Sequence, residues 1–576
     1  MAKINPLKKH LFFINICIIL FCFNTALAQT PKKIIIEHSD FADINQLQIP
    51  DAALLTGNVR VNHDGAILTC NKAYWFQKEN YIKAFGNVQI IQGDTLTMTS
   101  KYAEYNGNIK QAYATGDVVL RSPDMSLVTD TLNFNRNSQE AYYTTGGVIN
   151  NKGNSLKSKS GKYYVAQKKY QFLTAVVIKT PENTIKSNHL DYYTNSGHSY
   201  LLGPSTIDGK DNKIYTENGF YDTKKDIARL QRNSKIEYNN RLIEGDSLFY
   251  NKKRGFASAT NNVKITDTVN KIIVKGHYAE IYKFKDSVYV TKRALAISLI
   301  ERDSVYIHAQ KLMITGKENN RIIRGFKDAK FYKLNLSGKC DSIHSDQKKA
   351  LTKLIGRPIL WNFENQMTGD IMHLIGNNKT QQLDSLKVLN NAFIVSKDTI
   401  GIGFNQVKGQ NLYGKFKDKT LDNVDIIKNT EVIYYMRNDK QELIGINKSV
   451  CSKINLTLDK NKIDALTLFD KPDSDIYPEK DLPENARKLR GFIWREDERI
   501  KSIDDLFTKE ENEMNDKIIK ESNAKKAKAD VPMKVRKETL EYKETKKLYI
   551  NRCNVTTLSK LIDILHLSMD FIIQSQ

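Results

Sequence analysis

The sequence is poor in cysteine, proline and tryptophan, with 6, 11 and 3 of these residues among 576. Two cysteines precede residue 29, and the other four, Cys70, Cys340, Cys451 and Cys553, lie far apart. Domains stabilised by disulfides and structural zinc sites have closely spaced cysteines, so we expect no disulfide framework. Cys70 falls at an inward position of a predicted strand, which favours a small buried thiol.

Motifs of catalysis are also lacking. The sequence contains no Gly-x-Ser-x-Gly, His-Glu-x-x-His, Cys-x-x-Cys or Walker-type loop. Gly401-Ile402-Gly403 is a lone Gly-x-Gly without a following helix, which favours a turn. Asp341, His344 and Asp346 resemble a small metal site, but the repeat register places them on a strand and its following loop. We therefore expect no enzyme activity, no catalytic residue, no metal and no cofactor.

After residue 28 no apolar run is long enough to span a bilayer. Residues 1–28 have a basic start, an apolar run from Leu11 to Phe23 and the sequence Ala26-Leu27-Ala28. This order is typical of a secretory signal peptide. We expect cleavage after Ala28 and export of the mature chain, because a membrane anchor would need a longer apolar run.

The charge is strongly one-sided, with 88 Lys and Arg against 65 Asp and Glu and a net charge of +23. A basic surface suits anionic partners such as phosphorylated lipid head groups. The alternative is a composition rich in lysine and asparagine that spreads charge over every solvated strand face. Export makes nucleic acid an improbable partner.

The chain is built from a repeat, which is clearest between Thr56 and Tyr105. Gly57-Asn58-Val59-Arg60-Val61 recurs as Gly86-Asn87-Val88-Gln89-Ile90, and each copy is followed by a turn and a second alternating segment. Alternation of apolar and polar residues with a period of two predicts strands. Each unit is therefore a β-hairpin.

The apolar residue that opens the second segment recurs about every thirty residues, as expected of an array of supersecondary units. It is found at Leu68, Leu96, Leu127, Leu156, Ile185, Ile214, Ile243, Ile273, Val305, Leu336 and Met367. Weaker echoes continue to about residue 470. The sequence predicts an all-β, antiparallel array over residues 50–470.

Within the second segment, inward residue types stand at positions zero, two, five and seven from that apolar residue, whereas an ideal strand would use zero, two, four and six. The extra residue falls on polar pairs such as Asp130-Thr131, Asn188-His189 and Asp246-Ser247. A β-bulge or a sharp corner requires such an extra residue. Every unit should bend at the same place, and stacked bends make a trough of two sheets.

The first segments carry Gly or Asn before their apolar pair, as in Gly116-Asp117-Val118, Gly146-Gly147-Val148 and Asn261-Asn262-Val263. Gly and Asn tolerate left-handed backbone conformations. We expect these positions to be reversals between strands.

The Gly-Asn-Val starts and the Ile-x-Gly-Asp-Ser-Leu-x-Tyr continuations resemble the OstA family, which includes LptA-like proteins and the N-terminal domain of LptD. The likeness is clearest over residues 50–300, and Met367-Thr368-Gly369-Asp370 repeats it. With its long second half and the segment Leu489-Arg490-Gly491-Phe492-Ile493-Trp494, the chain looks most like the large Bacteroidetes members.

The resemblance implies an elongated open antiparallel β-jellyroll with a V-shaped section, whose apolar trough shelters acyl chains. It implies a periplasmic protein for lipopolysaccharide transport and outer-membrane assembly that can associate with the outer membrane. The implied partners are lipopolysaccharide or a related glycolipid, other β-jellyroll transport proteins that pair by strand edges, and an outer-membrane LptD-like protein.

The inward residues are the candidate lipid-binding positions, because a trough lined by apolar side chains keeps acyl chains from water at about 0.8 kcal/mol per methylene. They are Leu127, Leu132, Phe134, Ile185, Leu190, Tyr192, Ile243, Leu248 and Tyr250. The same lining would serve a closed core, so a structural or adhesive β-repeat protein of the envelope is the alternative. A β-helical polysaccharide-cleaving enzyme would need shorter coils and a cluster of Asp or Arg.

The expected organisation follows from these patterns. It consists of a signal peptide (1–28), OstA/LptA-like β-jellyroll repeats (29–300), more divergent repeats (301–470), a proline-punctuated loop segment (471–503) and a charged helical or disordered tail (504–576). Leu558 to Ile573 has apolar residues spaced for one helix face and is expected to cap the array or to contact a membrane or partner.

Overall fold

A computed structural model of the chain describes residues 32–530, except for 45–49, 94–95, 124, 152, 211, 239, 300–303, 318–319, 335, 378–379, 381, 399, 419 and 460–461. The predicted signal peptide and the stretch from Leu558 to Ile573 lie outside the described residues. The chain divides into two compact units, residues 1–516 and 517–576. The first unit holds all the strands of the described part, and the predicted charged helix is present as α2 (Lys509–Asp530).

The first half of the array consists of β1 (Ile35–His38), β2 (Phe41–Asp43), β3 (Ala53–His63), β4 (Ala66–Phe76), β5 (Tyr81–Gln92), β6 (Leu96–Asn106), β7 (Gln111–Ser122), β8 (Met125–Asn135), β9 (Glu140–Tyr143), β10 (Gly147–Asn151), β11 (Asn154–Ser158), β12 (Ser160–Tyr164), β13 (Lys169–Lys179), β14 (Asn183–Tyr193), β15 (His198–Gly209), β16 (Asn212–Asp222), β17 (Ile227–Tyr238), β18 (Arg241–Asn251), β19 (Phe256–Asp267) and β20 (Ile272–Tyr282).

The second half consists of β21 (Ser287–Thr291), β22 (Leu295–Ser298), β23 (Val305–His308), β24 (Lys311–Thr315), β25 (Ile322–Lys333), β26 (Leu336–Asp346), β27 (Leu351–Ile355), β28 (Ile359–Asn362), β29 (Asn365–Thr368), β30 (Ile371–Gly376), β31 (Leu383–Lys397), β32 (Phe404–Lys417), β33 (Thr420–Arg437), β34 (Leu443–Asp459), β35 (Lys462–Phe469) and β36 (Asp473–Tyr477). Short 3₁₀ turns are η2 (Lys283–Lys285), η3 (Glu479–Asp481), η4 (Glu484–Arg487), η5 (Glu496–Glu498) and η6 (Asp504–Leu506).

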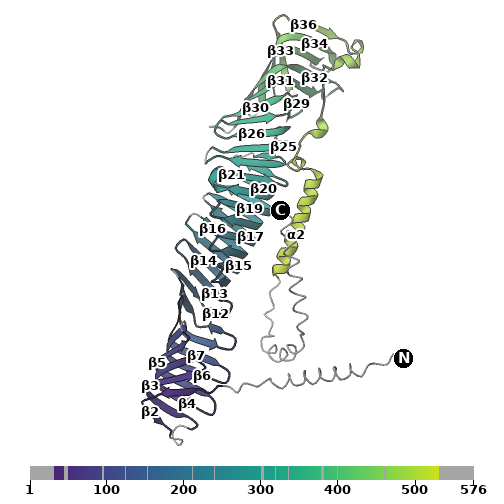
Figure 1. Cartoon of the computed structure of the whole chain (residues 1–576). Coiled ribbons are helices and arrows are strands. Elements are labelled where there is room, and N and C mark those ends of the chain that lie inside the picture. Colours follow the sequence, from purple (N-terminus) through teal and green to yellow (C-terminus); the bar gives the residue numbers. More distant parts are fainter. Residues whose placement is uncertain are drawn as a thin grey trace, which may run out of the picture. The chain divides into compact units, whose positions relative to one another are not determined.

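The strands follow one another in sequence order from β2 to β36 in one continuous sheet (Figure 1). Each long strand pairs antiparallel with the strand before it and the strand after it, as β7 does with β6 and β8. The predicted all-β antiparallel array is therefore confirmed.

A bulge bends each repeat at the same position. Between β7 and β8, Thr115 pairs with Thr131 and Val118 pairs with Thr129, so two residues of one strand face one residue of the other. The two residues are Gly116 and Asp117, and both have left-handed backbone conformations, with φ of 81° and 53°. Two residues against one is the geometry of a β-bulge, which kinks a strand. The bend predicted from the parity slip is confirmed in its position. The extra residue lies on β7, opposite Asp130, and not at Asp130-Thr131 as predicted.

The prediction that the Gly and Asn pairs are reversals between strands is wrong. Gly116-Asp117 and Asn261-Asn262 lie inside β7 and β19, at the bulge. Gly146 lies between β9 and β10, which pair with the two ends of β8. Two successive left-handed residues turn the strand through a corner and let it continue in the same sheet. The same left-handed pairs recur at Gly57-Asn58, Gly86-Asn87, Thr174-Ala175, Arg232-Asn233, Lys327-Asp328, Asn390-Asn391 and Lys428-Asn429.

The corner divides every repeat into two arms. We call first arm the side that contains residues 118–122 and 125–129, and second arm the side that contains residues 111–115 and 131–135. The inner faces of both arms contribute to one continuous buried core. Ten of the eleven residues that defined the repeat period belong to this core or pack against it.

The eleventh, Ile273, is a correction. Ile272 and Val274 are the buried inner residues of β20, and Ile273 packs on the outer face. Three consecutive apolar residues left the alternation ambiguous at this point, and a shift by one residue moves a side chain to the opposite face.

Residues 478–512, which we call the strap, return along the outer face of the first arm (Figure 1). Leu482 and Leu489 pack on Phe393, Val395 and Ile446. Further along, Ile500, Leu506 and Phe507 pack on Leu295 and Ile297. The strap therefore covers the outer face of this arm in two places, at β31–β34 and at β20–β25.

Candidate functional site

The two arms face each other across a trough whose closed side is the corner and whose mouth lies at the strand ends. Contacts that join residues of opposite arms establish this arrangement. The His63 Nδ1 of the first arm lies 2.7 Å from the Tyr105 hydroxyl of the second arm. A single apolar core fills the space between the arms.

The nine predicted lining residues all lie on the inner faces. Leu127, Ile185 and Ile243 lie on the first arm and are 2–5% exposed, and Leu132, Leu190 and Leu248 lie beside the corner on the second arm and are 0–2% exposed. The aromatic residues Phe134, Tyr192 and Tyr250 lie nearer the mouth and are half-buried. Their role in lipid binding stays a prediction.

An apolar cavity of about 60 Å³ lies between the arms near the start of the array, and we call it the N-terminal cavity. Its lining from the first arm includes Val61, Leu68, Ile90, Met98 and Leu120, and its lining from the second arm includes Ile82, Ala112, Leu132, Phe134 and Tyr163. Two of the predicted residues, Leu132 and Phe134, therefore line it. Carbon atoms form almost all of the exposed wall, which suits an alkyl chain.

Polar side chains cross the mouth of the N-terminal cavity. Arg136 Nη1 donates to the His63 carbonyl oxygen (3.1 Å), and Arg136 Nη2 donates to the Asp64 carbonyl oxygen (2.9 Å). Burial lowers the pKa of His63, and the nearby Arg136 charge lowers it further. Burial likewise raises the pKa of the Tyr105 hydroxyl. Neutral His63 and neutral Tyr105 hydrogen-bond each other across the mouth.

The beginning of the described chain closes this end of the trough. Ile34 is 3% exposed and belongs to the core. Its backbone N–H donates to Asn80 Oδ1 (2.7 Å), and Asn80 Nδ2 donates to the Lys32 carbonyl oxygen (3.0 Å). Since Asn80 lies in a turn of the second arm and β1 pairs with the first arm of β3, this segment spans the two arms.

A second cavity of about 380 Å³ lies in the middle of the array, and we call it the central cavity. Its apolar wall includes Ile236, Ile243, Tyr250, Ala257 and Ile281, two of which were predicted as lining residues. Leu127, Ile185, Leu190, Tyr192 and Leu248 line neither of these two cavities.

A four-residue ion network, which we call the bridge, forms part of the central cavity's wall. Arg241 is the first residue of β18 and Asp267 is the last residue of β19, both on the first arm. Asp286 and Arg321 lie at turns of the second arm. Arg241 Nη2 lies 2.7 Å from Asp286 Oδ1, and Arg321 Nη2 lies 3.2 Å from Asp267 Oδ2. Each arginine thus contacts a carboxylate of the opposite arm. Arg321 is only 6% exposed.

Reasoning from sequence missed the charged residues at the mouth. His63, Arg136, Arg241 and Asp267 each stand two residues from an inward apolar residue, and therefore at inward parity. A charged residue at the end of a strand, in a position that faces inward, is the sequence feature that indicates such a site. The apolar positions of the repeat alone do not indicate these charged residues.

From the sequence, Asp341, His344 and Asp346 were considered as a metal site. Within the described part of the chain, no group of three or more His, Cys, Asp or Glu side chains is placed to hold an ion. Asp341 lies at the corner, while His344 and Asp346 lie on the second arm of β26. Cys70 is a buried free thiol, as predicted, and burial raises its pKa to about 11.

No helix in the described residues is both long and apolar enough to cross a membrane. No curated protein is a significant match to this chain. Among solved structures, the chain is similar to the crystal structure of LptH, the LptA homologous periplasmic component of the conserved lipopolysaccharide transport device from Pseudomonas aeruginosa. The match has 15% identity and a TM-score of 0.14, and it covers 24% of this chain and 82% of that one.

The family comparison concerns the beginning of the array. Residues 31–188 match the family model described as OstA-like protein. This range contains the Gly-Asn-Val starts on which the resemblance was based, whereas the Ile-x-Gly-Asp-Ser-Leu-x-Tyr continuation at residues 243–250 lies beyond it. Residues 31–188 are thus similar to OstA-like proteins, and the predicted resemblance is confirmed over this range.

Proposed function

We propose that this protein carries lipopolysaccharide or a related glycolipid across the periplasm, holding acyl chains between the two arms of its bent sheet. The observation that supports this proposal is the N-terminal cavity, whose wall is almost entirely carbon and which lies inside the OstA-like range. A wall of this kind gains free energy from each methylene that it removes from water.

The related structure adds a second line of support. LptH is described as a periplasmic component of a lipopolysaccharide transport device, and this chain has an export-type N-terminal sequence. In the proposal, further transport proteins, including an outer-membrane LptD-like protein, pair with strand edges of the array, because unpaired edge groups accept an added strand. The protein is not proposed to be an enzyme.

A structural β-repeat protein of the cell envelope is the second candidate. The packing of the core favours it, since Leu132, Leu190 and Leu248 are 0–2% exposed and leave little space beside the corner. In that case the N-terminal cavity would be a packing defect of the core.

Photo-crosslinking in living cells tests the proposed function. A photoreactive phenylalanine analogue at Phe134, whose side chain lines the N-terminal cavity, should capture glycolipid. The matched control is the adjacent Asn133, which points to the opposite face of the same strand. Captured lipid would be identified by mass spectrometry. Equal capture at both positions, or none at Phe134 in a folded protein, would favour the structural candidate.

A further inference from the structure

The central cavity differs from the N-terminal cavity in its charge. Four cationic side chains line it, Arg241, Lys283, Lys317 and Arg321, against the two carboxylates of the bridge. The two bridge arginines are matched by Asp267 and Asp286. An excess of two positive charges therefore remains, and it comes from Lys283 and Lys317.

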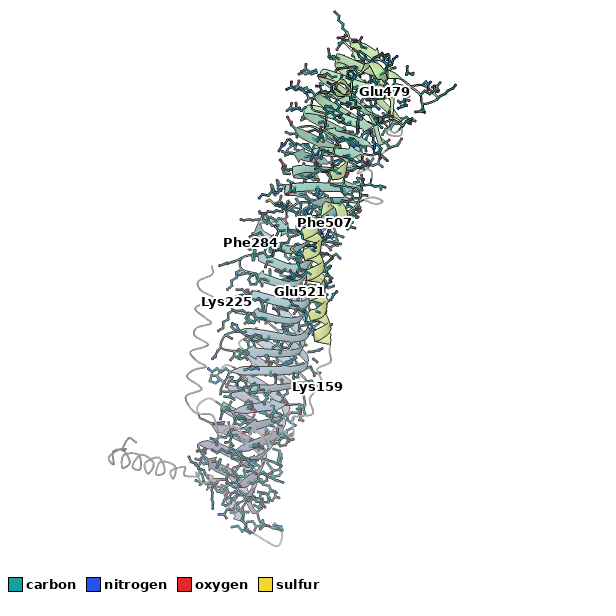
Figure 2. All side chains as sticks on the ribbon, turned by 90° about the vertical axis from the view of Figure 1, so that its right-hand side faces the viewer. Lys159, Lys225, Phe284, Glu479, Phe507 and Glu521 are labelled. Atoms are coloured by element: carbon teal, nitrogen blue, oxygen red, sulfur yellow. The ribbon has the colours of Figure 1, made fainter. Side chains whose placement is uncertain are left out.

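The two lysines are exposed, and Ile236, Ile243 and Ile281 form an apolar part of the cavity wall. Lys283 Nζ lies 4.6 Å from the centre of the Tyr238 ring, so its charge is held at the mouth between the arms. Phe284, beside it, is 73% exposed. Figure 2 shows Phe284 on the border of the sheet where turns of the second arm also place Lys225. An exposed phenylalanine and two lysines that line the same cavity offer both apolar and cationic contact.

We propose that the central cavity is a head-group site for an amphiphile with a phosphate monoester, the phosphate between Lys283 and Lys317 and the alkyl chain against Ile236, Ile243 and Ile281. A phosphate monoester carries about −1.5 to −2 charges at pH 7, which matches the excess of two. The volume of about 380 Å³ falls within the range of small-molecule sites, about 300–1,000 Å³. The inference deepens the proposed function and rests on it.

The bridge gives the site a floor. Arg241, Asp267, Asp286 and Arg321 also line a cavity of about 20 Å³ on their other side, together with Ile265, Val274 and Ile314. The network therefore separates the central cavity from the next part of the trough. The bridge limits how far the alkyl chain can enter the cavity. It does not bind the phosphate, because its charges are already paired with one another.

Calorimetric titration of the purified full chain tests the inference. Decyl phosphate, below its micelle concentration, should bind, whereas inorganic phosphate and decyl maltoside should bind at least tenfold more weakly. The variant Lys283→Met/Lys317→Met should lose about tenfold in affinity for decyl phosphate, and the loss should shrink in 0.5 M salt because salt screens exposed charges. Both lysines are exposed, so this variant keeps its core.

The matched control is Lys224→Met/Lys225→Met, which removes two charges from a turn of the second arm that does not line the central cavity. Its affinity for decyl phosphate should equal that of the native chain. Equal binding of inorganic phosphate would mean a simple anion site, and equal binding of decyl maltoside would mean that charge has no role. Either result, or equal losses in both double variants, would overturn the inference.

The outcome is separable from that of the proposed function. If decyl phosphate fails to bind while Phe134 still captures glycolipid in cells, the head-group site is refuted and the carrier function stands. If Phe134 captures nothing as well, the proposed function itself fails.

Discussion

The guanidinium of Arg293 lies 3.6 Å from the centre of the Phe507 ring, a cation–π contact that fastens the strap to the first arm. Arg293 stands at the corner between β21 and β22, and its Nη2 also donates to Asn512 Oδ1 (2.9 Å). The strap is held by this contact at one end and by two glutamines further up the array. Gln406 Nε2 donates to the Arg487 carbonyl oxygen (2.8 Å), and its Oε1 accepts from the Leu489 N–H (2.9 Å).

Gln366 repeats this arrangement with the Ile493 carbonyl oxygen and the Arg495 N–H, at 2.7 and 2.8 Å. Both glutamines are 1% exposed. Their amides pair with the strap backbone as a neighbouring strand would, so the strap satisfies polar groups that would otherwise be buried unpaired.

Removing an apolar strap side chain should destabilise the second half of the array. Leu489 is 5% exposed in the cluster with Phe393 and Ile433, so Leu489→Ala should lower the free energy of unfolding by about 2–5 kcal/mol. Urea denaturation measures the change. The control is Ile493→Ala in the same segment, where the side chain is 61% exposed and the change should stay within about 0.5 kcal/mol. Equal effects would mean that the strap does not pack as described.

Breaking the bridge should cost more than breaking an exposed ion pair. Arg321→Met leaves Asp267 and Asp286 with one arginine in a buried network, and an uncompensated buried charge costs about 3–5 kcal/mol. Lys252→Met removes the exposed ion pair with Glu182, and its cost should be below about 1 kcal/mol. Thermal or urea unfolding compares the two variants. A small effect of Arg321→Met would show that water reaches the network.

A β-branched residue at the corner should destabilise the fold, whereas glycine should be tolerated there. Asn87 is exposed and has φ of 47°, so its conformation and not its packing constrains the residue. Asn87→Val should cost about 1–2 kcal/mol, because a left-handed conformation brings Cβ against the following carbonyl. Asn87→Gly is the control and should leave stability nearly unchanged. Equal destabilisation by both substitutions would contradict a conformational origin.

Stability should fall as the pH drops below about 6.5. Burial lowers the pKa of His308, and the Lys330 and Arg293 charges add to this, against Glu511 and the Ala294 carbonyl, which raise it. The unfolded chain therefore binds a proton at a higher pH than the folded chain does. The stability that His308 contributes is fully present above the pKa that this residue has in the unfolded chain. It is lost progressively as the pH falls from that value to the pKa in the folded chain.

The midpoint of urea unfolding at pH 7.5 should accordingly exceed that at pH 5.5. His63, His277, His344 and His373 have pKa values lowered mainly by burial and act in the same direction. The variant His308→Gln should reduce the pH dependence without abolishing it. An unchanged slope in that variant would show that His308 does not contribute.

The sequence by itself determined the repeat, the strands and the bend. The spacing of the inward residues between Leu127 and Phe134 already requires a bend near Asp130-Thr131, because a regular strand cannot bury positions zero, two, five and seven on one face. The two-residue side of the bulge, Gly116-Asp117, lies on the neighbouring strand β7. Local geometry is sufficient for such features. At Ile272-Ile273-Val274 the sequence did not distinguish the two faces of the strand, because the core buries the inner face and the strap covers the outer face.

Tertiary structure alone decided which charges meet across the mouth. Arg241 and Arg321 are 80 residues apart in sequence, and only the folding of one arm over the other brings both to Asp267 and Asp286. The path of the strap was likewise decided by tertiary packing, since Gln366 and Gln406 look like ordinary strand residues until a second segment pairs with them. Contacts between segments far apart in the chain depend on how the sheet bends and stacks. The periodicity of apolar residues within a strand does not indicate which distant segments will meet.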